Sequence, residues 1–208
     1  MQCLLCKNDT IFFISIKDKE FFKCKKCHSI MLSPTNYLDK ENEKLRYKEH
    51  NNDVFDKRYQ DFVSPIVKAV LSDFDKGHKG LDFGSGTGPV ITKMLKDHEY
   101  DIEIYDPFFA NDIEKLDRRY DYIVCCEVME HFHNPRLEFN RLRNMLKTGG
   151  VLYLKTKVYN EDIDFKSWYY KDDPTHVFFY HIKGLEFIKK HYGFATMESL
   201  KDMIIYKI

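Results

Sequence analysis

The segment Leu81–Gly88, with the sequence Leu-Asp-Phe-Gly-Ser-Gly-Thr-Gly, constrains the fold of this chain more than any other segment. A short apolar run leads into a loop with glycine at every second position, and a helical pattern begins at Pro89. Because glycine lacks Cβ and tolerates positive φ, the backbone of such a loop can approach a ligand closely, and the following helix start presents free amides. The pattern predicts a site for a nucleotide-type cofactor between a strand and a helix.

An acidic residue separates this loop from the dinucleotide fingerprint G-x-G-x-x-G. Asp82 lies two residues before the first glycine, where the fingerprint has no carboxylate, and the glycine spacing is one residue shorter. A carboxylate here repels a pyrophosphate and attracts a cationic amino acid group. Leu81–Gly88 therefore resembles motif I of the class I S-adenosylmethionine (SAM) methyltransferases, in which the acid and the glycine loop hold the methionine part of SAM. The resemblance implies cofactor contacts from Asp82, Gly84, Ser85, Gly86 and Gly88.

Length and charge limit the classes of function. The chain has 208 residues, enough for one α/β domain with a small appendage. Lys+Arg and Asp+Glu are both 33, so no general attraction to nucleic acid follows, although a local basic patch stays open. The sequence has neither an apolar run of membrane-spanning length nor a signal-peptide pattern at its start, so we expect a soluble, cytoplasmic protein without a membrane partner.

Four cysteines form a second motif. They follow the pattern C-x2-C-x17-C-x2-C, which suits four thiolates closing a tetrahedral zinc site, and they are Cys3, Cys6, Cys24 and Cys27. The β-type runs between the pairs predict a hairpin, so residues 1–33 read as a zinc ribbon with structural Zn²⁺. Disulfides are disfavoured in the cytoplasm. The haem-attachment pattern C-x-x-C-H also matches at Cys24–His28, but the upstream pair and the missing export signal argue against haem.

Residues 34–76 are expected to form a helical cover. Apolar residues recur every three or four positions from Phe55 to Phe74, which predicts one long helix with a kink or restart at Pro65. The preceding segment carries Tyr47, His50 and Asn51. It reads either as a lid over cofactor and substrate, as methyltransferases often have here, or as a solvated linking helix.

Asp106 closes the next predicted strand, residues 102–105, where a carboxylate can accept hydrogen bonds from a ribose diol. The competing interpretation is a simple Asp-Pro turn. Phe108 or Phe109 would flank the adenine. Only residues 107–121 separate this strand from the apolar strand 122–126, too few for the helix, edge strand and helix usual in the family. We therefore expect a trimmed sheet edge and an adenine pocket built from Asn111, Asp112 and Ile113.

The segment 121–131 resembles the fourth motif of the family, in which the strand ends beside the transferred methyl group and a Glu-His pair faces the cofactor. The resemblance places Cys126 and Glu127 among the cofactor contacts, and Glu127 also serves as a candidate for positioning the SAM amino group or a substrate donor. Cys125 and Cys126 are expected to be buried strand residues. His131 and His133 are candidates for a base or a substrate contact, since imidazole titrates near neutrality.

The remaining segments complete the pattern. A helix is predicted from an Asn134 cap to Gly149-Gly150, then a strand over 151–154, a helix over 182–192 and two final strands over 195–200 and 203–208. The aromatic loop 168–181 would cover the active site, with His176 as the first choice for a base or substrate ligand. Alternatively, Thr175 and His176 cap the 182–192 helix.

The resemblance covers residues 80–208 and implies a Rossmann-like α/β/α sandwich with a mostly parallel sheet and an antiparallel C-terminal strand, preceded by the ribbon. The whole chain is similar to bacterial zinc-ribbon methyltransferases of unassigned substrate. We expect residues 77–208 to transfer the methyl group of SAM in line to a small-molecule acceptor, with catalytic roles for His176, His131 and Glu127. The alternatives are methylation of RNA or protein gripped by Lys23, Lys25 and Lys26, a non-catalytic zinc-ribbon module, and an NAD-dependent oxidoreductase, which Asp82 disfavours. Oligomeric state is unreadable from the sequence.

Overall fold

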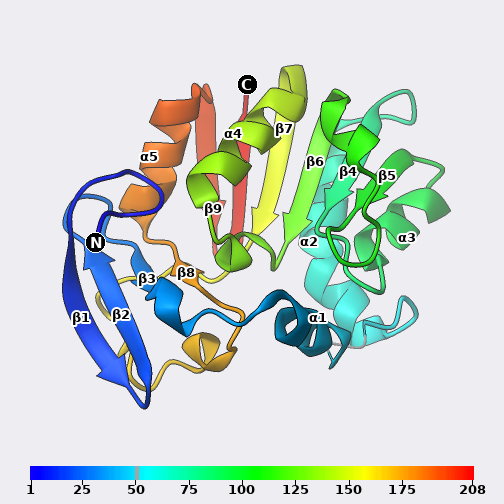
Figure 1. Cartoon of the computed structure of the whole chain (residues 1–208). Coiled ribbons are helices and arrows are strands. Elements are labelled where there is room, and N and C mark those ends of the chain that lie inside the picture. Colours follow the sequence, from blue (N-terminus) through cyan, green and yellow to red (C-terminus); the bar gives the residue numbers. More distant parts are fainter. Residues whose placement is uncertain (50–51) are drawn as a thin grey trace.

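A computed structural model describes residues 1–49 and 52–208 of the chain and contains two sheets (Figure 1). The larger sheet has the strand order β5-β4-β6-β7-β10-β9. Its members are β4 (Lys79–Phe83), β5 (Asp101–Tyr105), β6 (Tyr120–Cys126), β7 (Leu146–Lys155), β9 (Thr196–Leu200) and β10 (Met203–Lys207). Strands β5, β4, β6 and β7 are parallel, whereas β10 is antiparallel to both β7 and β9. The predicted fold class is confirmed.

Helices cover both faces of this sheet (Figure 1). The helices are α2 (Lys57–Asp73) and α3 (Val90–Asp97) on one face, and α4 (Pro135–Met145) and α5 (Ile182–Tyr192) on the other. Side chains alternate along β6, with Ile123 and Cys125 buried beneath α4 and α5, and Tyr122 and Val124 buried beneath α2 and α3. A central parallel strand buried on both faces requires such a continuous apolar run.

Among the described residues, the large sheet ends at β5 with no further strand on that side, which agrees with the predicted trimmed edge. Between β5 and β6 the chain forms only the 3-10 turn η2 (Ile113–Asp117), and β5 is the edge strand. The described part of the chain thus contains no strand beyond β5.

Two predicted helix boundaries are wrong. The helix expected from Phe55 begins at Lys57, because the side chain of Asp56 accepts a hydrogen bond from the Arg58 amide, and Phe55 is 74% exposed. Pro65 lies inside α2, which continues through it without a restart. The chain before it forms the turn η1 (Pro34–Asn36) and a separate helix, α1 (Lys40–Glu49).

The helix expected to end at Gly149-Gly150 ends at Met145, and both glycines belong to β7. Leu146 already pairs with Tyr120, and the register between β6 and β7 shifts before Tyr122. Gly149 has φ of 75°, so the glycine that looks like a helix stop allows a bulge instead.

The N-terminal sheet is joined to the rest of the chain through β8 (Phe178–Phe179). It contains β1 (Thr10–Ile16), β2 (Lys19–Cys24), β3 (Ile30–Leu32) and β8, in that order and all antiparallel. Figure 1 shows this sheet beside the lower part of the large sheet. In the contact between them, a Cβ on Gly184 of α5 would lie 2.5 Å from the Ser29 hydroxyl.

An aromatic cluster fills this contact. Phe179 is 1% exposed, and its ring packs against Phe21 at 6.1 Å, Phe165 at 5.2 Å and Trp168 at 5.8 Å between centroids. Aromatic rings meeting edge to face add to the stabilisation that burial provides. The cluster therefore holds the N-terminal sheet, through Phe21 and Phe179, against the loop after β7, which carries Phe165 and Trp168.

We predict that Phe179→Ala lowers the free energy of unfolding by about 3–5 kcal/mol, because it leaves a cavity where three rings meet. Urea denaturation followed by tryptophan fluorescence measures the change, since Trp168 lies in the cluster. Phe55→Ala, which removes the same side chain from an exposed position, should cost less than about 0.5 kcal/mol. Equal effects of the two substitutions would contradict the assigned role of the cluster.

Candidate active site

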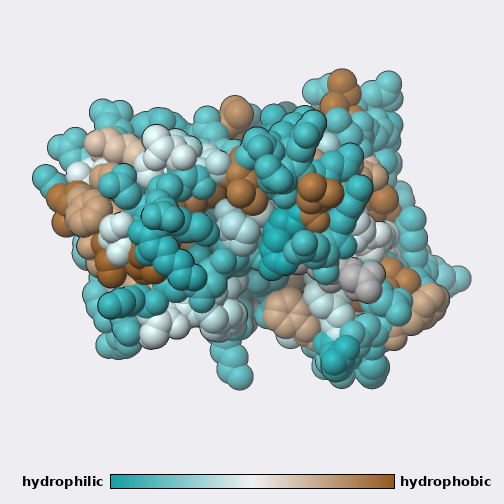
Figure 2. Space-filling model, turned by 60° about the horizontal axis from the view of Figure 1, so that its bottom comes forward, coloured by the Kyte–Doolittle hydropathy of each residue, from teal (hydrophilic) through white to brown (hydrophobic). Residues whose placement is uncertain are grey.

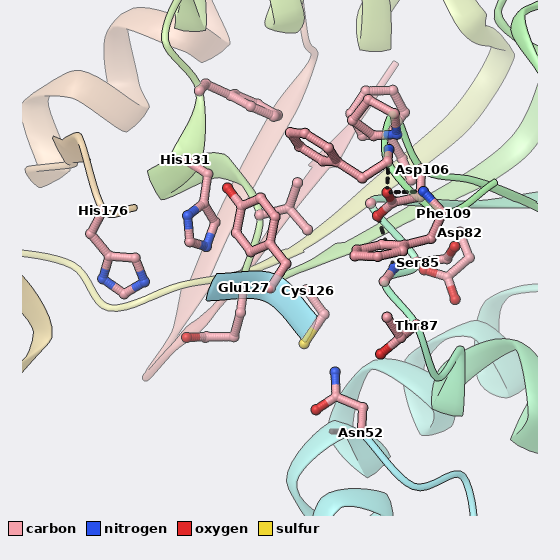
Figure 3. A pocket seen from close by; sticks show the side chains of 18 of the residues that line it. Asn52, Asp82, Ser85, Thr87, Asp106, Phe109, Cys126, Glu127, His131 and His176 are labelled. Carbon is pink, nitrogen blue, oxygen red and sulfur yellow. Dashed lines mark hydrogen bonds between the residues drawn. The ribbon is translucent and has the colours of Figure 1, made fainter. Parts of the chain in front are cut away.

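A cavity of about 1030 Å³ lies at the carboxyl edge of the parallel strands. The ends of β4, β5 and β6 form one side, and α1 and the 3-10 turn η4 (Tyr169–Asp172) contribute the other. Viewed from this edge, the surface is largely hydrophilic with separate hydrophobic patches (Figure 2). In the close-up, the glycine loop and Asp106 lie toward one end and His131 and His176 toward the other, with Cys126 and Glu127 between (Figure 3).

The glycine loop leaves room for a ligand and is closely packed behind. Gly84 and Gly86 have φ of 78° and 64°, the left-handed region that glycine tolerates. A Cβ on Gly84 would lie 2.5 Å from Val128, and one on Gly88 would lie 1.7 Å from the Asn52 carbonyl oxygen. The loop also holds the Ser85 hydroxyl, which is buried without a hydrogen-bond partner among the described residues. An unpaired buried hydroxyl beside a cavity fits a polar ligand.

Asp82 lines the cavity beneath this loop and is 4% exposed. Its Oδ2 accepts a hydrogen bond from the Thr92 hydroxyl at 2.8 Å. Burial raises the pKa of Asp82 to about 6, and the hydrogen bond from Thr92 opposes this shift. A carboxyl group with this pKa is ionised at neutral pH and binds a cation more strongly than water-exposed carboxylates do.

Asp106 connects two loops. Its Oδ2 accepts the Gly86 amide at 2.9 Å, and its Oδ1 accepts the amides of Phe108 at 2.8 Å and Phe109 at 3.0 Å (Figure 3). The Asp-Pro turn is therefore present, and the same carboxylate also lines the cavity. Three amide donors leave a carboxylate with lone-pair capacity for a further donor.

Phe108 and Phe109 line the cavity, and their contact with the adenine stays a prediction, but the prediction for the following residues is wrong. A backbone bridge between Asp106 and Ala110 turns the chain back before Asn111, and Asn111, Asp112 and Ile113 are all exposed outside the cavity. Asp112 caps η2 by accepting the Glu114 amide.

Two imidazoles meet at the other end. The Nδ1 atom of His131 lies 3.0 Å from the Thr175 carbonyl oxygen, and that of His176 lies 2.6 Å from the Tyr170 carbonyl oxygen. Because a carbonyl oxygen only accepts, each Nδ1 carries the proton, and Nε2 of each neutral ring carries the lone pair. The ring centroids are 4.7 Å apart. His133 also lines the cavity, beside Tyr37.

The alternative role of Thr175 and His176 as helix caps is wrong. Helix α5 is capped by His181, whose Nδ1 accepts the Lys183 amide at 3.1 Å. It ends at Gly193, with φ of 70°, as predicted.

A pair of carboxylates lies beside the imidazoles. Glu130 is completely buried, and its Oε1 accepts a short hydrogen bond from the Tyr170 hydroxyl while its Oε2 accepts one from Thr156 at 3.1 Å. The same tyrosine hydroxyl lies 3.2 Å from Oε2 of Glu127. Burial raises the pKa of both carboxyl groups, and for Glu130 the charge of Glu127 adds to the effect. Glu127 and His131 line the cavity, whereas Glu130 lies directly behind it.

Helix α1 covers the cavity. Glu43, Arg46 and Tyr47 share one helix face and line it, and the Tyr47 ring lies between Phe108, at 5.4 Å, and His131, at 5.2 Å. Arg46 is paired with Asp173 at 2.7 Å, which ties the helix to the loop after η4. The predicted contributions of His50 and Asn51 lie outside the described residues.

The strand cysteines differ in exposure. Cys125 is completely buried on the face away from the cavity, and Cys126 is half-buried and lines it. The expectation of a buried strand residue therefore holds in full only for Cys125.

The other four cysteines form a group able to hold a metal ion. Their Sγ atoms lie within 4.8 Å of one another, with 3.6 Å between Cys3 and Cys27 and 3.4 Å between Cys6 and Cys24. These separations exceed a disulfide bond of about 2.05 Å and approach the spacing of about 3.8 Å that tetrahedral Zn–S bonds of about 2.3 Å require. Amides of Lys26 and Cys27 point at Cys24 Sγ, each at 3.4 Å, which suits a thiolate ligand.

Comparisons with known proteins agree with this fold. A profile of the family described as a methyltransferase domain matches residues 55–199. A SAM-dependent methyltransferase structure from Archaeoglobus fulgidus is 17% identical with a TM-score of 0.55, and the match covers 72% of this chain and 94% of that one. Human N-acetylserotonin methyltransferase in complex with SAM is 14% identical with a TM-score of 0.53, over 79% of this chain and 56% of the human chain.

An O-methyltransferase family protein from Burkholderia thailandensis is 15% identical with a TM-score of 0.51, over 74% of this chain and 60% of that one. The chain thus spans less than two thirds of the Burkholderia and human proteins. At these identities the likeness shows the fold. The comparison with curated proteins gave no match.

The matched profile covers more than half of the chain, which therefore belongs to the methyltransferase domain family. This membership agrees with the enzyme class predicted from the sequence. No helix among the described residues is long and apolar enough to cross a membrane.

Sequence reasoning assigned no role to three residues of this site. Asn52 packs against Gly88, Tyr170 bridges the two carboxylates, and Glu130 anchors that bridge. The Glu-His pair in the fourth motif was the available signal for Glu130. Nothing in the local sequence distinguishes Asn52 from its neighbours.

We predict that Cys24→Ser removes the metal bound by the cysteine group and lowers the Tm by at least about 5 °C, because metal binding contributes directly to folding free energy. Atomic absorption of the purified protein and thermal scanning measure both effects. Cys126→Ser changes the same atom outside the group and should leave the metal content as in the wild type. Retention of metal by Cys24→Ser would refute the assignment.

Proposed function

We propose that this chain transfers the methyl group of SAM to a small-molecule acceptor within the cavity at the carboxyl edge of its sheet. The observation that carries the proposal is the division of one cavity into two ends, with an acid and glycine loop at one and two imidazoles at the other. Its volume of about 1030 Å³ suits a cofactor together with a small acceptor.

The residues at the first end suit the parts of SAM. Asp82 attracts the cationic amino group, and Asp106 has capacity for a ribose hydroxyl. The other cofactor contacts that we propose are Gly84, Ser85, Gly86, Gly88, Phe108, Cys126 and Glu127, all of which line the cavity. When bound, SAM supplies an electrophilic methyl group on a sulfonium.

The second end is suited to hold and orient the acceptor. His176 and His131 are fixed by hydrogen bonds from Nδ1 to backbone carbonyls, so each neutral ring offers Nε2 to a proton of the acceptor. Tyr170 and Tyr47 give aromatic walls that exclude water. The main task of the protein is alignment of the acceptor with the methyl group, since an in-line displacement depends on that geometry.

Two observations favour a small acceptor over RNA or protein. A macromolecule bound by the zinc ribbon would contact three lysines, Lys23, Lys25 and Lys26. The Lys23 ammonium lies 3.1 Å from Glu161 and 5.2 Å from the Tyr159 ring centroid, so only the other two lysines are exposed. Helix α1 also covers the cavity. A similar fold belongs to the human enzyme named for its small substrate, N-acetylserotonin.

The cysteine group fits Zn²⁺, and we propose a structural role for this ion within residues 1–33. Helices in residues 34–76 then cover the methyltransferase domain, residues 77–208. Four thiolates close the coordination shell and leave no position for a substrate.

We predict that S-adenosylhomocysteine, the product of the transfer, binds about tenfold more weakly at pH 5 than at pH 7.5. The pKa of Asp82 is about 6, so its carboxylate becomes protonated as the pH falls and no longer attracts the amino group. Calorimetric titration measures the affinity at each pH. Asp82→Asn should bind weakly at both pH values, whereas Asp75→Asn, the same change at an exposed carboxylate, should behave as the wild type. An affinity independent of pH in the wild type would contradict the role of Asp82.

A second experiment tests the acceptor class. Protein supplied with methyl-labelled SAM is incubated with separated small-molecule, RNA and protein fractions of a cell extract. We expect label in the small-molecule fraction and at least about tenfold less transfer by Asp82→Asn. Label in RNA or protein instead would overturn the small-acceptor proposal, and absence of both transfer and S-adenosylhomocysteine binding would support a non-catalytic module.

A further inference from the structure

The acceptor end of the cavity contains a second group of metal-ligating side chains. One ligand atom from each of Glu130, His131 and His176 lies within 4.8 Å of the other two. Two imidazoles and a carboxylate are a donor set that binds first-row divalent transition metals and leaves coordination positions open. The group therefore differs in kind from the closed set of four cysteines.

Two backbone carbonyls orient the imidazoles for this role. Backbone carbonyls of Thr175 and Tyr170 accept the Nδ1 protons of His131 and His176, which fixes the ring orientations and places the lone pair of each neutral ring at Nε2. Metal-binding histidines are usually held in this way.

His28, Glu161 and His181 form another group of the same composition. There, Nδ1 of His181 accepts the Lys183 amide, so Nε2 carries the proton toward Glu161 and the ring has no lone pair for a metal. Lys23 lies 3.1 Å from Glu161 and supplies the positive charge. The two groups therefore differ in histidine tautomer: Nε2 carries the lone pair in His131 and His176 but the proton in His181.

Charge balance also favours a cation at the first group. The four carboxylate oxygens of Glu127 and Glu130 share two hydroxyl protons, from Tyr170 and Thr156. Oε1 of Glu127 is buried and has no hydrogen-bond partner among residues 1–49 and 52–208. Lys155 and Lys157 pair with Asp202 and lower the pKa of Glu127 only from a distance, and within those residues neither carboxylate forms an ion pair with a lysine or arginine. Two buried carboxylates in contact with one phenol require a proton or a cation.

We propose that Glu130, His131 and His176 bind a divalent transition-metal ion at the acceptor end of the cavity, with Glu127 beside it. His131 and His176 line the cavity, so the site suits an acceptor that offers hydroxyl or carboxylate oxygens. With the ion bound, the Nε2 atoms of the two histidines ligate it and no longer take a proton from the acceptor. The ion would instead orient such an acceptor and lower the pKa of a bound hydroxyl, whose proton leaves to solvent before the methyl–sulfur bond breaks and the oxygen–methyl bond forms. The role in catalysis rests on the proposed function, but the binding of the ion does not.

The test uses Mn²⁺ as the probe, because this hard ion competes poorly for thiolates and gives an electron paramagnetic resonance signal when free. Protein that carries one Zn²⁺ per chain, which the four thiolates take first, is titrated with Mn²⁺, and we expect binding of one further ion per chain. His176→Gln, His131→Gln and Glu130→Gln should each weaken this binding at least about tenfold. His133→Gln, the same change at another histidine of the cavity wall, should leave it unchanged.

Binding of S-adenosylhomocysteine by each variant checks that it is folded, and Glu130→Gln preserves the shape of the side chain in contact with Tyr170. No bound Mn²⁺ in the wild type, or equal binding by His176→Gln and His133→Gln, would overturn the metal site while leaving the methyltransferase proposal intact. Mn²⁺ binding without any binding of S-adenosylhomocysteine would support the metal site and contradict the proposed methyltransferase function.

Discussion

The carboxylate of Asp106 holds together the two loops on which the cavity depends. It accepts one amide from the glycine loop and two from the loop after β5, so a single side chain fixes both walls of the cofactor end. Hydrogen bonds to a carboxylate are stronger than those between neutral groups, and three of them offset the cost of burying its charge. Asp106 thereby holds the left-handed Gly86, and the Tyr105 carbonyl oxygen accepts the amide of the left-handed Gly84 at 2.8 Å.

Buried acids recur along the whole cavity, but their partners differ. Asp82 is paired with a hydroxyl, Asp106 with backbone amides, and Glu130 with a tyrosine that also contacts Glu127. Asp106 at the cofactor end accepts three amides, whereas Glu127 at the acceptor end keeps one buried oxygen without a hydrogen-bond partner among the described residues. This difference matches the division of labour that we propose, in which the first end recognises a fixed cofactor and the second end meets a variable partner.

Local patterns in the sequence predicted the strands, the loop and the cysteine group, because each depends on spacing within one element. Failures occurred where distant contacts decide the outcome. The glycines at 149 and 150 look like a helix stop, yet pairing with β6 draws them into β7. The bridge between Asp106 and Ala110 moves Ile113 out of the site. Tyr170 and Glu130 are 40 positions apart, so no local pattern reveals their contact.

The short strand β8 connects the acceptor end of the cavity to the N-terminal sheet. His176 lies two residues before Phe178, which pairs with Met31, and the intervening Val177 accepts the Leu32 amide at 2.9 Å. The imidazole is therefore attached to the N-terminal sheet as closely as to the methyltransferase domain. An acceptor that displaces His176 therefore also moves backbone that pairs with β3 of the N-terminal sheet.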